Sequence, residues 1–312
     1  MAEADIRTIT LTDIPLLRRL SAAGILLDTE TALTRKAPGS HSTLLSSILF
    51  PAGIHTLIAR GGSRQVVGQL RYRQEDSCAH IVYIVPEGDD EQNNSLLILD
   101  ALAREAGRHG AHFLMAEIEP EHALYETLRQ ARFASYARQT IWRHQPVTRQ
   151  HETPLRLAQA TPQDEIGITS LLYNIIPTML QHVALPEGDM KGLLYRHEGQ
   201  IAAYIAYVEG ERGIYALPFI HTDVADIAQE LLEAAWTQLA SDDVPLYICI
   251  RTYQYWLDSI LDRMNFTSWT EQVMMVRHIA AGVHQPAFST GKLRLQGKLE
   301  VAPPTWSIMR RN

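Results

Sequence analysis

The stretch FASYARQ at residues 133–139 recurs as FTSWTEQ at residues 266–272, so Phe, Ser, an aromatic residue and Gln fall at matching places. The offset is 133 residues (266 minus 133). The same offset places Leu128 on Leu261, and residues 98–99 on residues 231–232, without a gap. Chance produces a short match easily, but it does not keep hydrophobic phase over roughly fifty residues. The repeat therefore predicts two copies of one α/β unit.

The chain length agrees with two copies. A chain of 312 residues is long enough for two domains of about 150 residues each. We predict an N-terminal domain over residues 1–145, a polar linker with prolines over 146–154, a C-terminal domain over 155–280, and a tail over 281–312. The sequence assigns no role to the tail.

Composition excludes several classes of protein. The net charge of −7 gives no support for nucleic-acid binding, which needs a basic surface. Cys78 and Cys249 cannot build a disulfide framework, and neither lies in a metal-binding spacing. The N-terminus lacks a basic region followed by a long apolar run, so we expect no secretion signal, and no run approaches the roughly 20 apolar residues of a membrane span. We expect a soluble cytoplasmic protein without a nucleic-acid, membrane or metal partner.

Each copy alternates strand and helix patterns in the same order, β-α-loop-β-β-β-α-β-α-β. Residues 36–55 make the first copy longer than the second, which places an insertion there. The predicted inner strands are residues 55–60, 66–73, 80–85 and 113–118 in the first copy, and 192–196, 200–209, 213–220 and 246–250 in the second.

This order resembles the GNAT superfamily of acyl-CoA N-acyltransferases, over nearly the whole chain and twice. The resemblance implies two tandem GNAT-like α/β (α+β) domains, each a mixed twisted sheet with helices on both faces. It also implies acetyl-CoA or another acyl-CoA as cosubstrate, and a small-molecule or peptide amine as acceptor. In that family a Q/R-x-x-G-x-G/A loop after the fourth strand binds the CoA diphosphate through backbone N–H groups at a helix N-terminus.

Neither copy keeps this glycine signature. The equivalent loops read DEQNNS at residues 90–95 and DVADIA at residues 223–228. The first loop also gathers the four carboxylates of Glu87, Asp89, Asp90 and Glu91. Repulsion of about 1 kcal/mol from each charge should outweigh a helix-dipole contribution of roughly 0.3–1 kcal/mol. We therefore expect the first copy to be empty and any acyl-CoA to bind in the second.

The resemblance predicts which residues of the second copy would hold the ligand. The pantetheine arm would bond to the edge of the fourth strand, where Pro218 supplies no N–H. The acyl group would lie beside Arg251 and Tyr253. Tyr253 is the best available acid, because Leu128 and Leu261 occupy the places where the family often has a catalytic tyrosine. The predicted cofactor-binding residues are Leu217, Phe219, Ile220, His221, Thr222, Ala225, Asp226, Ile227 and Ala228.

Three further groups of residues have more than one interpretation. Glu117, Glu119 and Glu121 alternate at a strand end and would bind an amine, act as a base, or lie in solvent. His109 and His112 have a helical spacing, but Gly110 interrupts it, so we predict no metal site there. Residues 251–256 carry Arg and aromatic side chains that suit either a substrate pocket or the seam between the copies.

Two functions remain open on sequence grounds. One is an N-acyltransferase with its chemistry in the C-terminal half. The other is a non-catalytic GNAT-fold protein that binds a small molecule or a protein, favoured by the missing glycines and the missing tyrosine. Because one chain already supplies two copies, we expect a monomer that resembles a dimer, with a homodimer as the alternative.

Overall fold

The computed structural model describes residues 5–13, 15, 24–35, 53–61, 64–73, 76–85, 91–146, 155–186 and 190–279. Most of the predicted insertion, most of the linker, the acidic residues 87, 89 and 90, and the tail lie outside the described residues. Residues Met1–Ala281 belong to one compact unit.

The first copy contains most of the predicted elements. Arg132 has a φ of 68° immediately before Phe133, and the equivalent Asn265 has a φ of 61° before Phe266, so the two copies share even an unusual backbone turn. The described elements are β1 (Asp5–Thr8), η1 (Leu11–Asp13), β2 (Ile25–Leu26), α2 (Thr29–Thr34), β3 (Ile54–Gly61), β4 (Arg64–Arg71), β5 (Cys78–Val85), α4 (Glu91–Arg108), β6 (Phe113–Ile118), α5 (Leu124–Gln130) and β7 (Ala134–His144).

The second copy repeats the order with shorter helices. Its elements are β8 (Ala158–Gln159), η3 (Pro162–Asp164), α6 (Glu165–Ile175), η4 (Thr178–Leu180), β9 (Lys191–His197), β10 (Gln200–Glu209), β11 (Ile214–Ile220), η5 (Thr222–Ile227), α7 (Ala228–Leu239), β12 (Leu246–Arg251), η6 (Thr252–Leu257), α8 (Asp258–Arg263) and β13 (Thr267–His278). The helices of the second copy alternate with strands as the periodicity predicted, whereas most of the opening helix predicted for the first copy lies outside the described residues.

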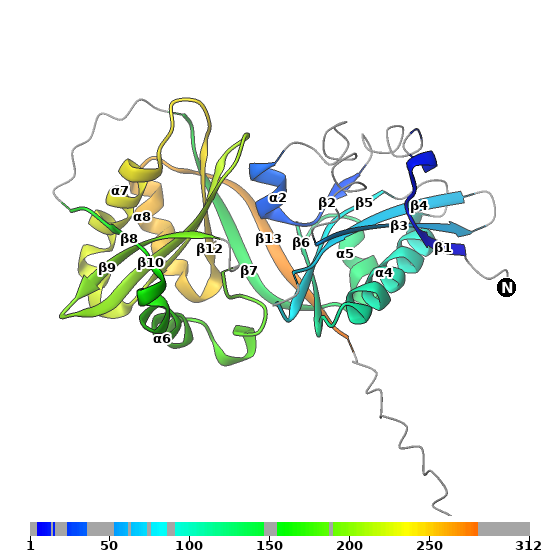
Figure 1. Cartoon of the computed structure of the whole chain (residues 1–312). Helices are drawn as coiled ribbons and strands as arrows, with labels where there is room; N and C mark the ends of the chain where they lie inside the picture. The colour runs from blue at the N-terminus through cyan, green and yellow to red at the C-terminus, as the bar shows by residue number, and fades with distance from the viewer. Residues whose placement is uncertain are drawn as a thin grey trace, which may run out of the picture. The chain divides into compact units, whose positions relative to one another are not determined.

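The closing strands are exchanged between the two copies. The sheet runs β1-β3-β4-β5-β6-β13-β7-β12-β11-β10-β9-β8, with β2 pairing to β5 off this path. Strand β13 completes the sheet of the first copy beside β6, and β7 completes that of the second beside β12. The predicted order of elements along the chain did not indicate which half of the sheet each closing strand would join. Figure 1 shows β7 and β13 side by side in the middle of the molecule.

The repeated glutamine marks the centre of this exchange. Gln139 is directly opposite Gln272 in the antiparallel β7–β13 ladder. Their side chains bond to each other, with Gln139 Nε2 donating to Gln272 Oε1 over 3.0 Å. Because these are equivalent residues of the two copies, an approximate two-fold axis passes between them. The motif that revealed the repeat thus also lies at its approximate two-fold axis.

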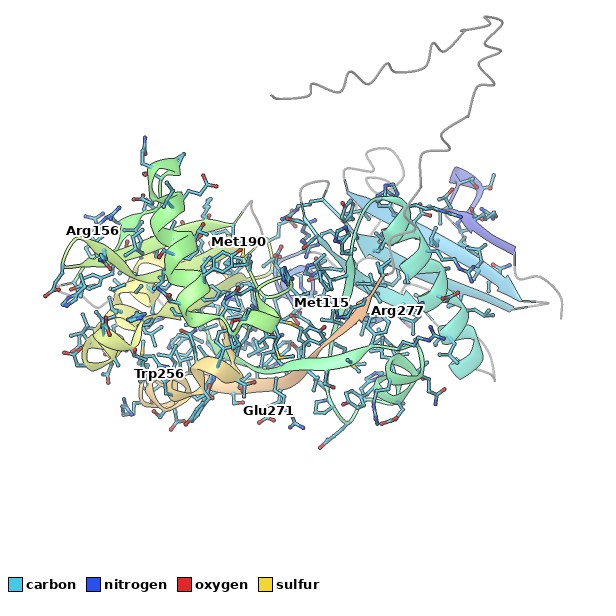
Figure 2. The ribbon with its side chains drawn as sticks, turned by 90° about the horizontal axis from the view of Figure 1, so that it is seen from below. Met115, Arg156, Met190, Trp256, Glu271 and Arg277 are labelled. Carbon is cyan, nitrogen blue, oxygen red and sulfur yellow. The ribbon has the colours of Figure 1, made fainter. Side chains whose placement is uncertain are left out.

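Helices cover both faces of the second half of the sheet, because successive strand residues point to opposite sides. Ala203 and Ile205 of β10 pack in a cluster with α7 and α8, whereas Tyr204 and Ala206 pack in a cluster with α6. The α6 cluster extends into the first copy, where it includes Met115 of β6. Figure 2 labels Met115 near the middle of the molecule. One apolar cluster therefore joins the two copies.

Among the described residues, none of the helices combines the length and the apolar character that crossing a membrane would require.

Candidate functional site

Each half of the sheet opens where two parallel strands diverge. The β11–β12 ladder ends at the pair Ala216 and Ile248, four residues before β11 itself ends. The β5–β6 ladder ends at the pair His80 and Met115, five residues before the end of β5. We call these openings the C-terminal splay and the N-terminal splay. They lie where the resemblance to the GNAT superfamily predicted the pantetheine arm.

A strand of the chain itself fills the N-terminal splay. Ile25 and Leu26 of β2 pair antiparallel with Ile84 and Tyr83 of β5. The N–H of Leu27 donates to Val82 O over 3.0 Å, and the Leu27 carbonyl accepts from the Glu117 N–H of β6 over 2.8 Å. Residues 25–27 thus bond to both diverging strands. No element was predicted for this segment.

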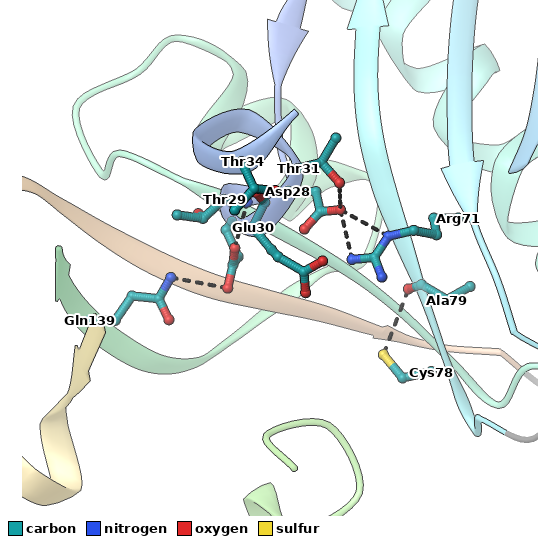
Figure 3. A network of polar contacts seen from close by, with 10 residues as sticks. Asp28, Thr29, Glu30, Thr31, Thr34, Arg71, Cys78, Ala79 and Gln139 are labelled. Carbon is teal, nitrogen blue, oxygen red and sulfur yellow. Dashed lines mark hydrogen bonds and ion pairs between the residues drawn. The ribbon is translucent and has the colours of Figure 1, made fainter. Parts of the chain in front are cut away.

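Buried polar contacts hold the segment in place (Figure 3). Asp28 accepts from the Arg71 guanidinium over 2.8 Å and from Thr31 Oγ1 over 2.7 Å, and both charged side chains are almost fully buried. Burial would raise the pKa of Asp28, but the Arg71 charge and the hydrogen bonds prevail and lower it. Asp28 is therefore an ion that requires its partner. The sequence feature that could have indicated this anchor is the Asp-x-x-Thr pattern of residues 28–31.

Glu117 belongs to the same network and does not form a site with its neighbours. Its Oε2 accepts from the Thr29 N–H over 2.9 Å, and its Oε1 accepts from Gln139 Nε2 over 3.0 Å. Glu119 and Glu121, by contrast, are exposed. Of the three interpretations, solvent exposure holds for Glu119 and Glu121, while Glu117 is a buried acceptor of structural hydrogen bonds.

In the C-terminal splay one side chain takes the place of a strand. Gln254 of η6 is 3% exposed. Its Nε2 donates to Pro218 O over 2.6 Å, and its Oε1 accepts from the Ile220 N–H over 2.9 Å. The N and O of one strand residue point to the same side, so the N–H that Pro218 lacks would also face the splay. The proline therefore removes a donor that would otherwise point into the splay.

The apolar side chains predicted to bind the cofactor belong to the core. Leu217 and Phe219 are 5% and 1% exposed. They pack in one cluster with Leu180, Val183 and Ala184, which follow α6. Ile220 packs on the opposite face of the sheet, with Val224 and α7. Only the backbone of residues 217–220 is therefore placed to meet a ligand at the splay.

The predicted diphosphate loop is a tight 3-10 turn leading into α7. Thr222, Ala225 and Asp226 are exposed, whereas Ala228 is fully buried. His221 Nδ1 accepts from the Asp223 N–H over 3.3 Å, and the Ala228 N–H donates to Ala225 O. Because the turn uses some of its own donors, fewer backbone N–H groups remain than at an ordinary helix N-terminus.

Arg251 and Tyr253 lie together at the end of β12, as predicted. Arg251 is buried and donates to the carbonyl of Ala184. Within the described structure, neither Arg251 Nε nor the Tyr253 hydroxyl has a hydrogen-bond partner. Burial raises the pKa of Tyr253, with the Arg251 charge opposing the shift. At neutral pH the two groups therefore offer an N–H and an O–H to a carbonyl or a thiolate.

Thr252 of the 251–256 segment contributes to the seam between the copies. Thr252 Oγ1 donates to Arg138 O of β7 over 2.6 Å and accepts from the Arg138 N–H over 3.0 Å. Tyr255 is 71% exposed. Thr252 thus lies at the seam, whereas a substrate pocket beside Arg251 and Tyr253 stays a prediction.

A pocket of about 470 Å³ adjoins the C-terminal splay at His221. Its wall combines Ser170 and Asn174 of α6 with Arg196 and His197 of the β9–β10 hairpin. Of its polar residues, His221 is a predicted cofactor-binding residue and Asp223 belongs to the predicted diphosphate loop. The others come from elements that are distant in sequence, and no motif marks them.

Comparison with known proteins identifies the architecture. No family model and no curated protein matches the sequence. Among solved structures, a tandem GNAT protein from the clavulanic acid biosynthesis pathway, determined without acetyl-CoA, is similar over 89% of this chain and 99% of its own, with 14% identity and a TM-score of 0.52. A GCN5-related N-acetyltransferase from Sphaerobacter thermophilus is similar over 89% and 96%, with 11% identity and a TM-score of 0.56.

At such identities the similarity establishes architecture, and it agrees with the two diverging strand pairs described above. The chain has the fold of the GNAT superfamily, built twice in one polypeptide.

Proposed function

We propose that this chain is a non-catalytic tandem GNAT-fold protein that binds a small molecule instead of transferring an acyl group. One observation carries the proposal: both splays are closed by the protein's own hydrogen-bonding groups. Strand β2 occupies the edge of β5, and Gln254 occupies the edge groups of β11. A pantetheine arm would have to displace these groups to form its usual backbone bonds. The missing glycines in both loops support the same conclusion.

The pocket beside His221 is the best candidate for the remaining ligand site. Its volume of about 470 Å³ falls within the range of small-molecule pockets. Guanidinium, imidazole, carboxylate, amide and hydroxyl groups line it, so it suits a small polar ligand. Arg196 is already paired with Asp164, which leaves the imidazoles and Asn174 as the groups that would orient such a ligand.

An acyl-CoA N-acyltransferase in the C-terminal half is the second candidate. The closure of this splay by the single side chain of Gln254 favours this function, because a change of the Gln254 rotamer would open the splay. Arg251 Nε and the Tyr253 hydroxyl are buried nearby without partners. In this function they would bond to the acyl carbonyl and to the leaving thiolate, and an amine would be the acceptor. The cosubstrate would be acetyl-CoA or another acyl-CoA.

Calorimetric titration with acetyl-CoA separates the two functions. We expect no saturable binding to the intact chain at millimolar ligand. Gln254→Ala frees the two β11 groups, so binding that appears only in this variant would identify Gln254 as the cause of closure. Micromolar binding to the intact chain that Thr222→Glu with Ala225→Glu abolishes would support the acyltransferase instead. Loss of such binding on changing Asn93 or Ser95 would place the site in the N-terminal half.

We also propose that the protein is a monomer in solution. The exchange of β7 and β13 already completes both halves of the sheet within one chain, so no second copy is needed to supply a closing strand. Size-exclusion chromatography with light scattering tests this directly, and a mass of about twice 35.1 kDa would contradict it.

A further inference from the structure

A group of three metal-ligand side chains lies outside the splays, on the N-terminal half. His55 of β3, Glu105 of α4 and His109 just after α4 present one donor atom each, and these atoms all lie within 4.8 Å of one another. We propose that these three residues bind a zinc ion, with the fourth coordination position open. This site is independent of the function proposed above.

Local structure brings the three residues together. Glu105 and His109 are four residues apart, so they lie on one face of the helix. The His109 N–H still donates to the Glu105 carbonyl over 3.2 Å, so the helical geometry reaches His109 although Gly110 then turns away with a φ of 96°. Helix α4 packs across β3 and β4, and this packing places His55 beneath the last turn.

The polar contacts within the group already point its donors inward. His109 Nε2 lies 3.3 Å from Glu105 Oε1, and the rings of His55 and His109 have centroids 4.0 Å apart. Arg108 bonds to the other carboxylate oxygen, Glu105 Oε2, over 2.9 Å. Oε1 therefore remains available for a metal.

The geometry requires only a small contraction. Ligand atoms about 2.1 Å from a tetrahedral zinc ion lie about 3.4 Å apart. The widest separation here is below 4.8 Å, so the donors must close by at most about 1.4 Å, within the reach of side-chain rotation. The side chain of His109 is 37% exposed, so it is free to rotate and leaves an entry path.

The chemistry of the donors selects the ion. Imidazole nitrogens favour zinc and its transition-metal neighbours over calcium or magnesium, and one carboxylate lowers the charge that the ion brings. Two histidines and one glutamate leave one position for water, as in three-ligand zinc sites generally. The ion would link the end of α4 to the first residues of β3. The sequence did not indicate the site, because His55 precedes Glu105 by 50 residues (105 minus 55).

Zinc titration of the untagged full chain, first stripped of metal with a chelator, tests the site. We expect one zinc ion per chain, in competition with a chromophoric chelator. His55→Ala and Glu105→Gln should each weaken binding by at least about 100-fold, because each removes a ligand. The control is His112→Ala, which removes the histidine that the sequence spacing alone would have paired with His109. Its affinity should stay within about twofold of the original.

A second readout separates a lost ligand from a damaged fold. The metal-free variants should keep the melting temperature of the metal-free parent. Cobalt bound to the parent should show the visible absorption bands of a tetrahedral site, and these bands should be absent from His55→Ala. Absence of tight zinc binding in the parent would overturn the proposal. So would tight binding that survives both ligand substitutions, or equal loss in His112→Ala.

Discussion

The two halves share one fold but close their splays by different means. In the N-terminal half, residues 25–27 bond to both diverging strands through their backbone, and a buried ion pair anchors the segment. In the C-terminal half, the amide of Gln254 bonds to two backbone groups of a single strand. Opening the first requires a segment to unfold, whereas opening the second requires one side chain to rotate. Two copies of a repeat can thus close the same opening by two routes with very different energies.

The largest expected effect concerns the anchor of the N-terminal closure. Asp28→Ala removes a buried carboxylate that accepts from the Arg71 guanidinium over 2.8 Å, and so breaks a buried ion pair. We expect the free energy of unfolding to fall by about 3–5 kcal/mol, measured by urea denaturation. Glu209→Ala is the control, because it breaks an exposed ion pair and should cost less than about 1 kcal/mol. A loss of similar size in both variants would show that the buried pair is not the anchor.

A smaller effect is expected at the symmetry axis. Gln139 donates both to Gln272 and to the buried carboxylate of Glu117. Gln139→Leu should therefore cost about 2–3 kcal/mol of stability, because it leaves a charged oxygen without its donor. Gln272→Leu removes the same residue type from the equivalent position, where Ile250 stands in place of Glu117. It should cost only about 1 kcal/mol, and equal costs would show that the two halves are energetically alike here.

A still smaller effect is expected for the C-terminal closure. Gln254→Ala leaves Pro218 O and the Ile220 N–H unpaired, at a cost of about 1–2 kcal/mol. Amide hydrogen exchange followed by NMR should become faster at Ile220. It should stay unchanged at Ile84, which pairs with Ile25 of β2 in the other half. Unchanged exchange at Ile220 would mean that another group replaces Gln254 and that its closure is not specific.

The smallest effect concerns a buried thiol. Burial raises the pKa of Cys249 to about 12, above its unfolded value, so its contribution to stability is complete at neutral pH and is lost as pH rises toward 12. Cys249→Ala introduces the residue of the equivalent N-terminal position, Ala116. Between pH 7 and pH 9 the original protein should lose about 0.8 kcal/mol more than this variant. Denaturation curves at the two pH values test this, and parallel losses would contradict it.

The sequence indicated those site residues that are neighbours in the chain, and it did not indicate those whose role depends on distant segments. Arg251 and Tyr253 lie together because they are two residues apart at a strand end, which the sequence states directly. Gln254, next in the chain, was not predicted to matter, because its role depends on the backbone of a strand 34 residues earlier. The histidines and Asn174 around the pocket are likewise brought together only by packing. The position of a bound ligand therefore stays a prediction.

Sequence alone determined the repeat, the order of the elements and most strand and helix positions. Residues 113–118 and 200–209 were predicted with the bounds the structure has, since periodicity and turn residues act within a few residues of each other. Tertiary structure alone decided the exchange of β7 and β13. Both closing strands carry the same motif, so either could pair beside β6 or β12. Only the packing of the whole chain distinguishes the two arrangements, and it is this packing that sets Gln139 against Gln272 and closes both splays.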